Sequence, residues 1–521
     1  MWIVLGEEKG RIKLVSKSET GGIIPKGSFL TIEEGNSKFL LRVDDSLQTE
    51  PYSPAPMLAD MDLSPLKQDQ KCQNIIYAYR VRDITQRSDG LIDFIRPQSL
   101  ARRSNQDEID LALGSEGQGL EVFVATIYAG KNQVLCDEEG NPIKARLPID
   151  MFYHQMLICG KTGSGKTVAT KYLAQYFVEE LKGYGAVLAI NVKDVDFLRM
   201  DQPSVTIQKS VEFEWKALNK KPHGIDNFIV YYPANTYIEP GQGVNQDICR
   251  RISLNVENLD PDALSGLLIG ITDIATQHLP NIFRFWQDNR RRNGGEFTFG
   301  DFVNYFWNGV NDNYQYDTLN SRGDVGIIRL PWNTYENIYR NLDYAREFFD
   351  EEDAIELTAA DILQRGKTSV INVAGRKGIQ FGCVILRHLL RNIVEEKRSG
   401  KSNIPVLIII DEVHNFYDTT SSKEALGELD TICRTGRSKE IGVIFSSQNP
   451  SDMPRGLSNV INTKIFFKTD VAIARDFGIY VSTEEMQSLK KGYAVANIHD
   501  LSQLKAIKFP LSLSGVFEKG S

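Results

Sequence analysis

The first part of the chain consists of short hydrophobic runs separated by polar turns that contain glycine. Runs rich in β-branched and aromatic residues occupy residues 2–5, 11–15, 29–33 and 39–43. Residues 6–10 and 34–38 form the turns within these two pairs, a pattern typical of β-hairpins. Further strand-like sequence follows at residues 75–81 and 120–127. Residues 1–130 are therefore predicted to form a small N-terminal β-barrel.

From about residue 131 the pattern changes to strands that alternate with helices. A buried strand at residues 154–159 is followed by an amphipathic helix at 167–181 and a second buried strand at 186–191. Strands that alternate with helices predict parallel βαβ units. Residues 131–245 are thus predicted to be the first part of an α/β core.

The next segment, residues 246–362, has the periodicity of helices, for example at 261–277 and 335–349. We predict that it is a helical insertion. The α/β pattern then resumes over residues 363–480, which are predicted to form the second part of the core. Strands are expected at 369–373, 406–410 and 442–446, and helices at 381–398 and 423–434.

The last segment, residues 481–521, holds short strands at 493–498 and 504–509 and is predicted to be a tail strapped onto a neighbour. At 521 residues the chain is long enough for two or three domains, and 41% hydrophobic residues suffice for a sizeable core. The formal net charge of −8 excludes a basic coat, so contact with nucleic acid must be local.

The six cysteines are far apart and form no C-x-x-C pair, which argues against a zinc site or disulfide framework and suits a reducing cytosol. The N-terminus becomes charged too soon for a signal peptide. The longest apolar runs are only as long as strands, so no membrane contact is expected. The sequence therefore predicts a cytoplasmic protein.

A phosphate-binding loop lies between the strand at 154–159 and the helix that follows it. Its spacing is G-x-x-x-x-G-K-[ST], and it consists of Gly160, Lys161, Thr162, Gly163, Ser164, Gly165, Lys166 and Thr167. The glycines allow backbone N–H groups to face the phosphates of ATP. Lys166 is expected to neutralise the β- and γ-phosphates and Thr167 to ligate Mg²⁺. The alternative is an accidental glycine-rich turn.

Two acidic residues end the buried strand at 406–410. Asp411 is placed to hold the Mg²⁺ shell, and Glu412 to orient and deprotonate the attacking water. A single acid would suit a kinase or a GTPase, whereas the pair favours hydrolysis that drives motion. The alternative is an ordinary strand end with acidic residues.

Two further candidates flank the strand at 442–446. Gln448 follows it and is predicted to sense the γ-phosphate, although it could instead only cap a loop. Arg434 and Arg437 precede it, and an arginine from one subunit of a ring can complete the site of the next. The alternative for these arginines is a solvated basic helix end.

The order of these elements resembles the HerA/FtsK superfamily of hexameric DNA-pumping ATPases, and HerA-like proteins most closely. Residues 411–416, Asp-Glu-Val-His-Asn-Phe, are similar to the family signature D/E-E-A-H-N-F. Residues 435–439 and 447–452 look like its G-R-K…S-Q-x-P-[AS]-D segment, and residues 489–494 like its L-x-x-G-x-A turn. The matches run from about residue 120 to 510, and the N-terminal barrel matches in layout only.

The resemblance implies a RecA-like P-loop NTPase core with an N-terminal barrel and a helical insertion, assembled as a homohexamer around double-stranded DNA. It makes Arg437 the favoured trans-acting arginine, with Arg434 second, and supports Gln448 as sensor. The chain departs from the family at 191–196, where Asp-x-x-Gly-Glu is usual. It also departs at His154, where archaeal members tend to carry Arg, so a cis-acting arginine cannot be carried over.

The predicted function is an ATP-hydrolysing DNA translocase or helicase motor. HerA relatives work with a separately encoded nuclease or other effector, in DNA-end resection or in antiphage defence, and this chain shows no nuclease carboxylates at interpretable spacing. One alternative is an ATP-regulated ring scaffold that assembles and activates an effector subunit. Another is an ATPase similar to those of type IV secretion.

Overall fold

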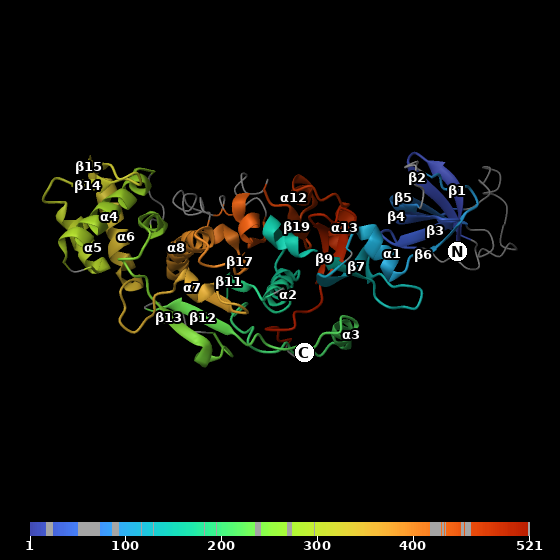
Figure 1. Cartoon of the computed structure of the whole chain (residues 1–521), viewed down its shortest axis with the longest axis horizontal. Coiled ribbons are helices and arrows are strands. Elements are labelled where there is room, and N and C mark those ends of the chain that lie inside the picture. Colours follow the sequence, from blue (N-terminus) through green and yellow to red (C-terminus); the bar gives the residue numbers. More distant parts are fainter. Residues whose placement is uncertain are drawn as a thin grey trace, which may run out of the picture.

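The computed structural model describes most of the chain. It covers residues 1–16, 24–49, 73–85, 93–115, 117–128, 130–181, 183–193, 195–234, 241–267, 273–295, 297–416, 429, 432, 434–449, 453 and 460–518. The molecule is elongated, with the barrel at one end, the insertion at the other and the α/β core between them (Figure 1). Among the described residues, no helix combines the length and the apolar character that crossing a membrane requires.

The N-terminal strands close into an antiparallel barrel in the order β1-β2-β5-β4-β3-β6. The strands are β1 Trp2–Glu8, β2 Arg11–Ser16, β3 Phe29–Glu34, β4 Ser37–Thr49, β5 Gln73–Thr85 and β6 Leu100–Arg103. Alternate residues face inward, so that Leu14, Leu30 and Phe39 are fully buried. The barrel and both hairpins predicted from the sequence are confirmed.

The barrel ends earlier than the predicted boundary at residue 130. The strand β7 Leu120–Tyr128 pairs with β8 Lys131–Val134, β9 Lys144–Leu147 and β21 Ala506–Lys508, which are all outside the barrel. It therefore belongs to the core. The sequence of β7 could not reveal this, because its pairing partners lie in distant parts of the chain.

The core is one large sheet in the order β13-β12-β16-β11-β17-β18-β10-β19-β20-β21-β7-β8. The strands not yet given are β10 Met156–Cys159, β11 Ala186–Asn191, β12 Phe228–Pro233, β13 Cys249–Ile252, β16 Thr368–Asn372, β17 Val406–Ile410, β18 Ile441–Ser447, β19 Thr463–Phe466 and β20 Tyr493–Asn497. From β13 to β19 every pair is parallel. This confirms the predicted α/β class.

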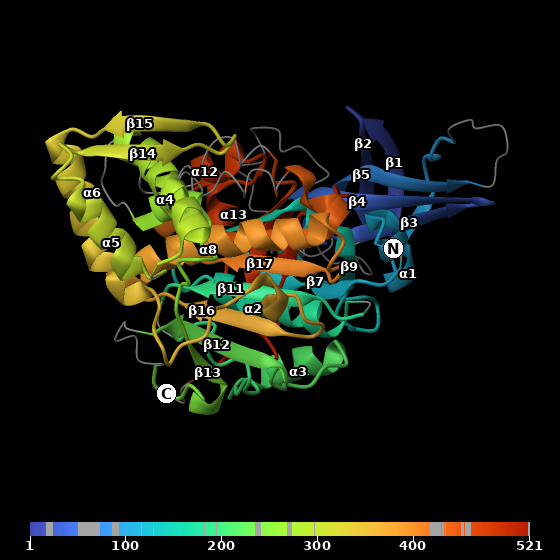
Figure 2. The ribbon, with the colours of Figure 1, turned by 60° about the vertical axis from the view of Figure 1, so that its left-hand side comes forward.

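Helices cover both faces of the parallel part of the sheet. Leu173 and Phe177 of α2 Lys166–Glu179 belong to the hydrophobic cluster on one face. Phe381 and Leu389 of α8 Arg376–Arg398 belong to the cluster on the other. Figure 2 shows α8 along the sheet beside β17. Because β17 and β18 are sandwiched in this way, they are buried along their whole length; β17 is entirely hydrophobic, and β18 is largely so.

The segment predicted as a helical insertion, residues 246–362, includes near its start the strand β13, which belongs to the core sheet. The rest of it is mainly helical, as predicted, but its elements differ in detail. It contains η5 Pro261–Leu267, α4 Asp273–Asn293, α5 Phe299–Asn308, α6 Trp332–Tyr344, η6 Ala345–Phe348 and α7 Ala359–Ile362. Where one helix was predicted at 261–277, the described residues form the 3-10 helix η5 and the first residues of α4. The helix predicted at 335–349 is α6, which begins at Trp332 and ends at Tyr344. The hairpin of β14 Gln315–Leu319 and β15 Val325–Arg329 was not predicted.

The C-terminal tail lies on its own chain. β20 and β21 extend the sheet, and Ser514 and Phe517 form bridges to Pro203 and Val205. The Lys171 ammonium on α2 donates a hydrogen bond to the Gly515 carbonyl over 2.8 Å. The described part of the tail therefore packs on the core of its own chain, and the expectation that it is strapped onto a neighbour stays a prediction.

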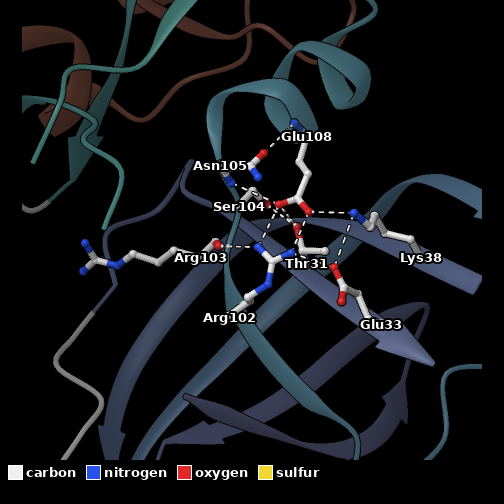
Figure 3. Close-up of polar contacts among 8 residues, drawn as sticks. All are labelled: Thr31, Glu33, Lys38, Arg102, Arg103, Ser104, Asn105 and Glu108. Carbon is white, nitrogen blue, oxygen red and sulfur yellow. Dashed lines mark hydrogen bonds and ion pairs between the residues drawn. The ribbon is translucent and has the colours of Figure 1, made fainter. Parts of the chain in front are cut away.

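The helix α1 Gln106–Leu113 joins the barrel to the core. Its residue Glu108 accepts hydrogen bonds from Thr31, Lys38 and Arg102, which belong to three barrel strands (Figure 3). On its other side, the Gln106 side chain donates to the Lys144 carbonyl over 2.7 Å and accepts from the Lys144 amide over 3.0 Å. The helix therefore makes specific polar contacts with both domains.

Candidate nucleotide site

The order of the strands brings the predicted site residues to one edge of the sheet. β18 lies between β10 and β17, and all three are parallel. The phosphate loop follows β10, Asp411 and Glu412 follow β17, and Gln448 follows β18. Because the carboxyl ends of parallel strands meet at the same edge, these segments are neighbours there.

The phosphate loop has a fixed backbone conformation that needs glycine. Gly163 and Gly165 have φ values of 77° and 114°, which L side chains rarely adopt. A Cβ atom on Gly165 would also lie 2.9 Å from the Gly492 nitrogen. That nitrogen donates a hydrogen bond to the Ser164 carbonyl over 3.1 Å, so the turn at Gly492 supports the loop directly.

The loop has the features of a phosphate cradle. Lys166 is buried, and its ammonium donates a hydrogen bond to the Gly160 carbonyl over 2.6 Å. Burial lowers the pKa of Lys166, whereas the charges of Glu412 and Asp411 act in the opposite direction. The Ser164 hydroxyl is buried and makes no hydrogen bond among the described residues. A basic group in a narrow turn fits a bound polyphosphate.

Oxygen ligands for a magnesium ion lie beside this cradle. Asp411 is buried at the end of β17, and burial raises its pKa to about 6. Thr167 begins α2 directly after Lys166. A carboxylate and a hydroxyl are the hard donors that Mg²⁺ prefers, and the ion usually keeps several waters and phosphate oxygens as well. The residues present therefore fit Mg²⁺ bound together with a nucleotide.

Glu412 is held by groups from several elements. Its Oε1 atom accepts hydrogen bonds from Lys193 over 2.5 Å and from Gln448 over 2.8 Å. Burial raises its pKa, but these two hydrogen bonds and the charge of Lys193 outweigh burial, so that the pKa lies below its ordinary value. Its φ of 45° turns the chain away from the strand direction. Glu412 is thus a buried, ionised carboxylate beside the cradle.

Gln448 connects this carboxylate to the phosphate loop. Its amide nitrogen donates to Glu412, and its carbonyl oxygen accepts a hydrogen bond from the Thr162 hydroxyl over 3.0 Å. The sequence predicts a place for Gln448 beside the phosphates, but neither of these two contacts. Because the Gln448 side chain contacts both the phosphate loop and Glu412, a movement of either one would move Gln448 too.

Arg437 lies at the other edge of the sheet. It belongs to η8 Gly436–Lys439, directly before β18, and is exposed beside Asp150 at 4.0 Å. Arg434 is exposed as well. The helix predicted at 423–434 falls almost entirely outside the described residues. The structure does not bring either arginine to the nucleotide site of its own chain.

Lys193 is a site residue that the sequence does not predict. Residues 191–196 depart from the family pattern, and no role follows for them from the sequence. The only available signal was that Lys193 follows a buried strand, as Glu412 does. That the two strands are neighbours could not be known from the sequence.

Comparison with known proteins gives two family matches. Residues 133–393, half of the chain, match the model of the central domain of the helicase HerA. Residues 345–466 match the model of the HerA-like C-terminal domain. Together with the parallel sheet, the first match confirms the RecA-like P-loop core.

Two curated relatives are similar in sequence. The DNA double-strand break repair helicase HerA of Sulfurisphaera tokodaii is 22% identical over 338 residues, which cover 63% of this chain and 58% of that protein. The helicase HerA of Saccharolobus solfataricus is 26% identical over 136 residues, 24% of this chain and 27% of that protein. The chain thus matches little more than half the length of the first relative.

The comparison with solved structures matches the bacterial conjugative coupling protein TrwBdeltaN70 in its unbound monoclinic form. It has a TM-score of 0.49 and 13% identity, and the match covers 80% of this chain and 93% of that one. VirB4 of Thermoanaerobacter pseudethanolicus has a TM-score of 0.44 and 13% identity, with 76% and 97% covered.

Proposed function

The chain belongs to the family of the helicase HerA, and from this premise we propose that it is an ATPase that moves double-stranded DNA. The observation that carries the proposal is the direct contact between Gln448, Glu412 and the phosphate loop at one edge of the sheet. A loop alone would indicate only that phosphates are bound. A carboxylate held beside it supplies the base that hydrolysis needs.

In this proposal each residue has one task. The backbone of Gly160–Thr167 and the Lys166 ammonium bind the phosphates, and Thr167 and Asp411 hold Mg²⁺, which neutralises charge on the phosphate oxygens. Glu412 orients a water molecule and accepts its proton. Gln448, in contact with both Thr162 and Glu412, signals whether the γ-phosphate is present.

The working form in this proposal is a homohexamer in which Arg437 acts in trans. Arg437 precedes β18 and Gln448 follows it, so the two are separated by a strand of seven residues. At about 3.3 Å per residue, roughly 20 Å lie between the arginine and the nucleotide site of its own chain. An exposed arginine at that edge is instead available to the site of an adjacent subunit.

We further propose that the ring works with a separately encoded nuclease or other effector, in DNA repair or in antiphage defence. The support is the similarity to proteins named as double-strand break repair helicases. In this assignment the motor supplies movement and the partner supplies the second activity.

The test is steady-state ATP hydrolysis by the full chain, with and without double-stranded DNA at low salt and with the co-purified partner. DNA should stimulate hydrolysis, Lys166→Ala should abolish nucleotide binding, and Glu412→Gln should abolish turnover while ATP still binds. Glu257→Gln, at an exposed acid of the insertion, is the control and should behave as wild type. Turnover that persists in Glu412→Gln refutes the assignment of the base, and DNA that neither binds nor stimulates refutes translocation.

A further inference from the structure

We propose that Lys193 is a positioning residue for ATP hydrolysis, which holds one oxygen of the Glu412 carboxylate so that the other oxygen faces the attacking water. The inference rests on the proposed ATPase function and assigns a task to a residue outside the phosphate loop and the acidic pair. Four observations carry it.

The first observation is that the sheet delivers Lys193 to Glu412. β11 pairs with β17, and Ile190 is opposite Ile410. Lys193 lies three residues beyond Ile190, and Glu412 lies two residues beyond Ile410. The two side chains therefore emerge at the same edge, although 219 residues separate them in the chain.

The second observation is that Glu412 is held from both sides through the same atom. β17 lies between β11 and β18 in the sheet. Lys193 comes from the β11 side and donates to Glu412 Oε1 over 2.5 Å, and Gln448 comes from the β18 side and donates to the same oxygen over 2.8 Å. Two donors on opposite sides of one oxygen fix the plane of the carboxylate.

The third observation concerns the other oxygen, Oε2. It is buried, and among the described residues no group donates a hydrogen bond to it. The Nδ1 atom of His414 lies 3.4 Å away. Lys193 and Gln448 both donate to Oε1, so Oε2 keeps the capacity to accept a hydrogen bond from another donor. The water to be deprotonated is a donor of this kind.

The fourth observation is the backbone at Glu412. Its φ of 45° lies in the left-handed region, which is strained for a residue with a side chain. From this turn the side chain contacts Lys193 and Gln448, which follow the two neighbouring strands. Hydrogen bonds therefore fix the direction of the Glu412 carboxylate. Of the two hydrogen bonds to it, the one from Lys193 comes from a charged donor.

The test compares Lys193→Met, Lys193→Arg and Lys220→Met in the full chain. Lys220 forms an ion pair with Glu180 away from the site, and its side chain is 34% exposed, against 46% for Lys193. Steady-state kinetics give kcat and KM, and binding of a fluorescent ATP analogue gives Kd. Thermal unfolding of each variant shows whether it is folded.

We expect Lys193→Met to lower kcat by about 10- to 100-fold, the effect of a misplaced catalytic group, with KM and Kd unchanged. Lys193→Arg, which keeps a charged donor, should restore most of kcat, and Lys220→Met should match wild type. An unchanged or higher kcat in Lys193→Met overturns the inference, and so does a weaker Kd, which would make Lys193 a ligand of the phosphates. If the wild-type chain does not hydrolyse ATP, the proposed function fails as well; if it does, an insensitive Lys193→Met refutes this inference alone.

Discussion

Replacing Glu108 by Gln should loosen the barrel without touching the nucleotide site. Glu108 is buried at the third position of α1, and its carboxylate accepts hydrogen bonds from Thr31, Lys38, Arg102 and the Asn105 amide. Burial alone would raise the pKa of this carboxyl, but the hydrogen bonds from Arg102 and Lys38 outweigh it and lower the pKa to about 2. Glutamine keeps the shape and removes the charge.

The size of the effect follows from this pKa. A carboxyl whose pKa is 4.5 in the unfolded chain and about 2 in the folded chain contributes about 3 kcal/mol at neutral pH. The side chains of Arg102 and Lys38 are 37% and 35% exposed, and solvent screening there reduces the figure to about 1–2 kcal/mol. Because the folded pKa is lowered, this stabilisation is complete above pH 4.5 and is lost as the pH falls toward 2.

Hydrogen exchange at pH 7, followed by mass spectrometry of barrel peptides, measures this stability locally. A loss of about 1–2 kcal/mol raises the opening constant of residues 29–43 and 100–113 by about 5- to 30-fold. Glu33→Gln is the matched control. Glu33 also contacts Arg102 and Lys38, but its side chain is 52% exposed, so its removal should change exchange very little.

The reasoning is refuted if the barrel peptides of Glu108→Gln exchange as slowly as those of the wild type at pH 7. It is also refuted if Glu33→Gln speeds barrel exchange as much as Glu108→Gln does. A third refuting result is that Glu108→Gln speeds exchange of the peptide that contains β17 as much as that of the barrel peptides. The last would mean that the barrel and the core open as one unit and that the Glu108 contacts do not stabilise the barrel by themselves.

Two further predictions concern the nucleotide site. Gly165→Ala places a Cβ atom 2.9 Å from the Gly492 nitrogen at a φ of 114°, so it should weaken binding of a fluorescent ATP analogue, and unchanged affinity would show that the loop tolerates the shift. Arg437→Ala should lower ATP turnover by about 10³-fold, the smaller effect known for arginine fingers, while nucleotide binding is retained. Dilution of the wild-type chain should lower turnover per subunit in the same way, and undiminished turnover in either experiment would contradict action in trans.

The sequence predicted the parts of this structure that depend on local patterns. The strands β10, β11, β17 and β18 are recognisable because buried parallel strands are hydrophobic throughout, and the phosphate loop is recognisable because its chemistry requires a fixed spacing. Features that depend on distant pairing were not predictable. The place of β7 in the core, the contact of the tail with residues 203–205 and the bond between Lys193 and Glu412 all join segments far apart in the chain.

The hairpin of β14 and β15 was missed for a different reason. Gln315–Leu319 is short and largely polar, and its burial alternates only weakly. Only Tyr316 on this strand is buried, and it stacks on Phe306 of α5 with ring centroids 4.8 Å apart. A single anchoring residue leaves no periodic signal in the sequence.

The position of β18 has a consequence for the timing of neighbouring sites. One end of this strand carries Gln448, which touches Glu412, and the other end leads from Arg437. Its seven residues are all buried between β10 and β17, so the two ends are joined by a closely packed segment of the core. If Arg437 acts in trans as proposed above, this one strand connects the Gln448 of its own nucleotide site with the arginine offered to the next site. The states of neighbouring sites would then be coupled through β18.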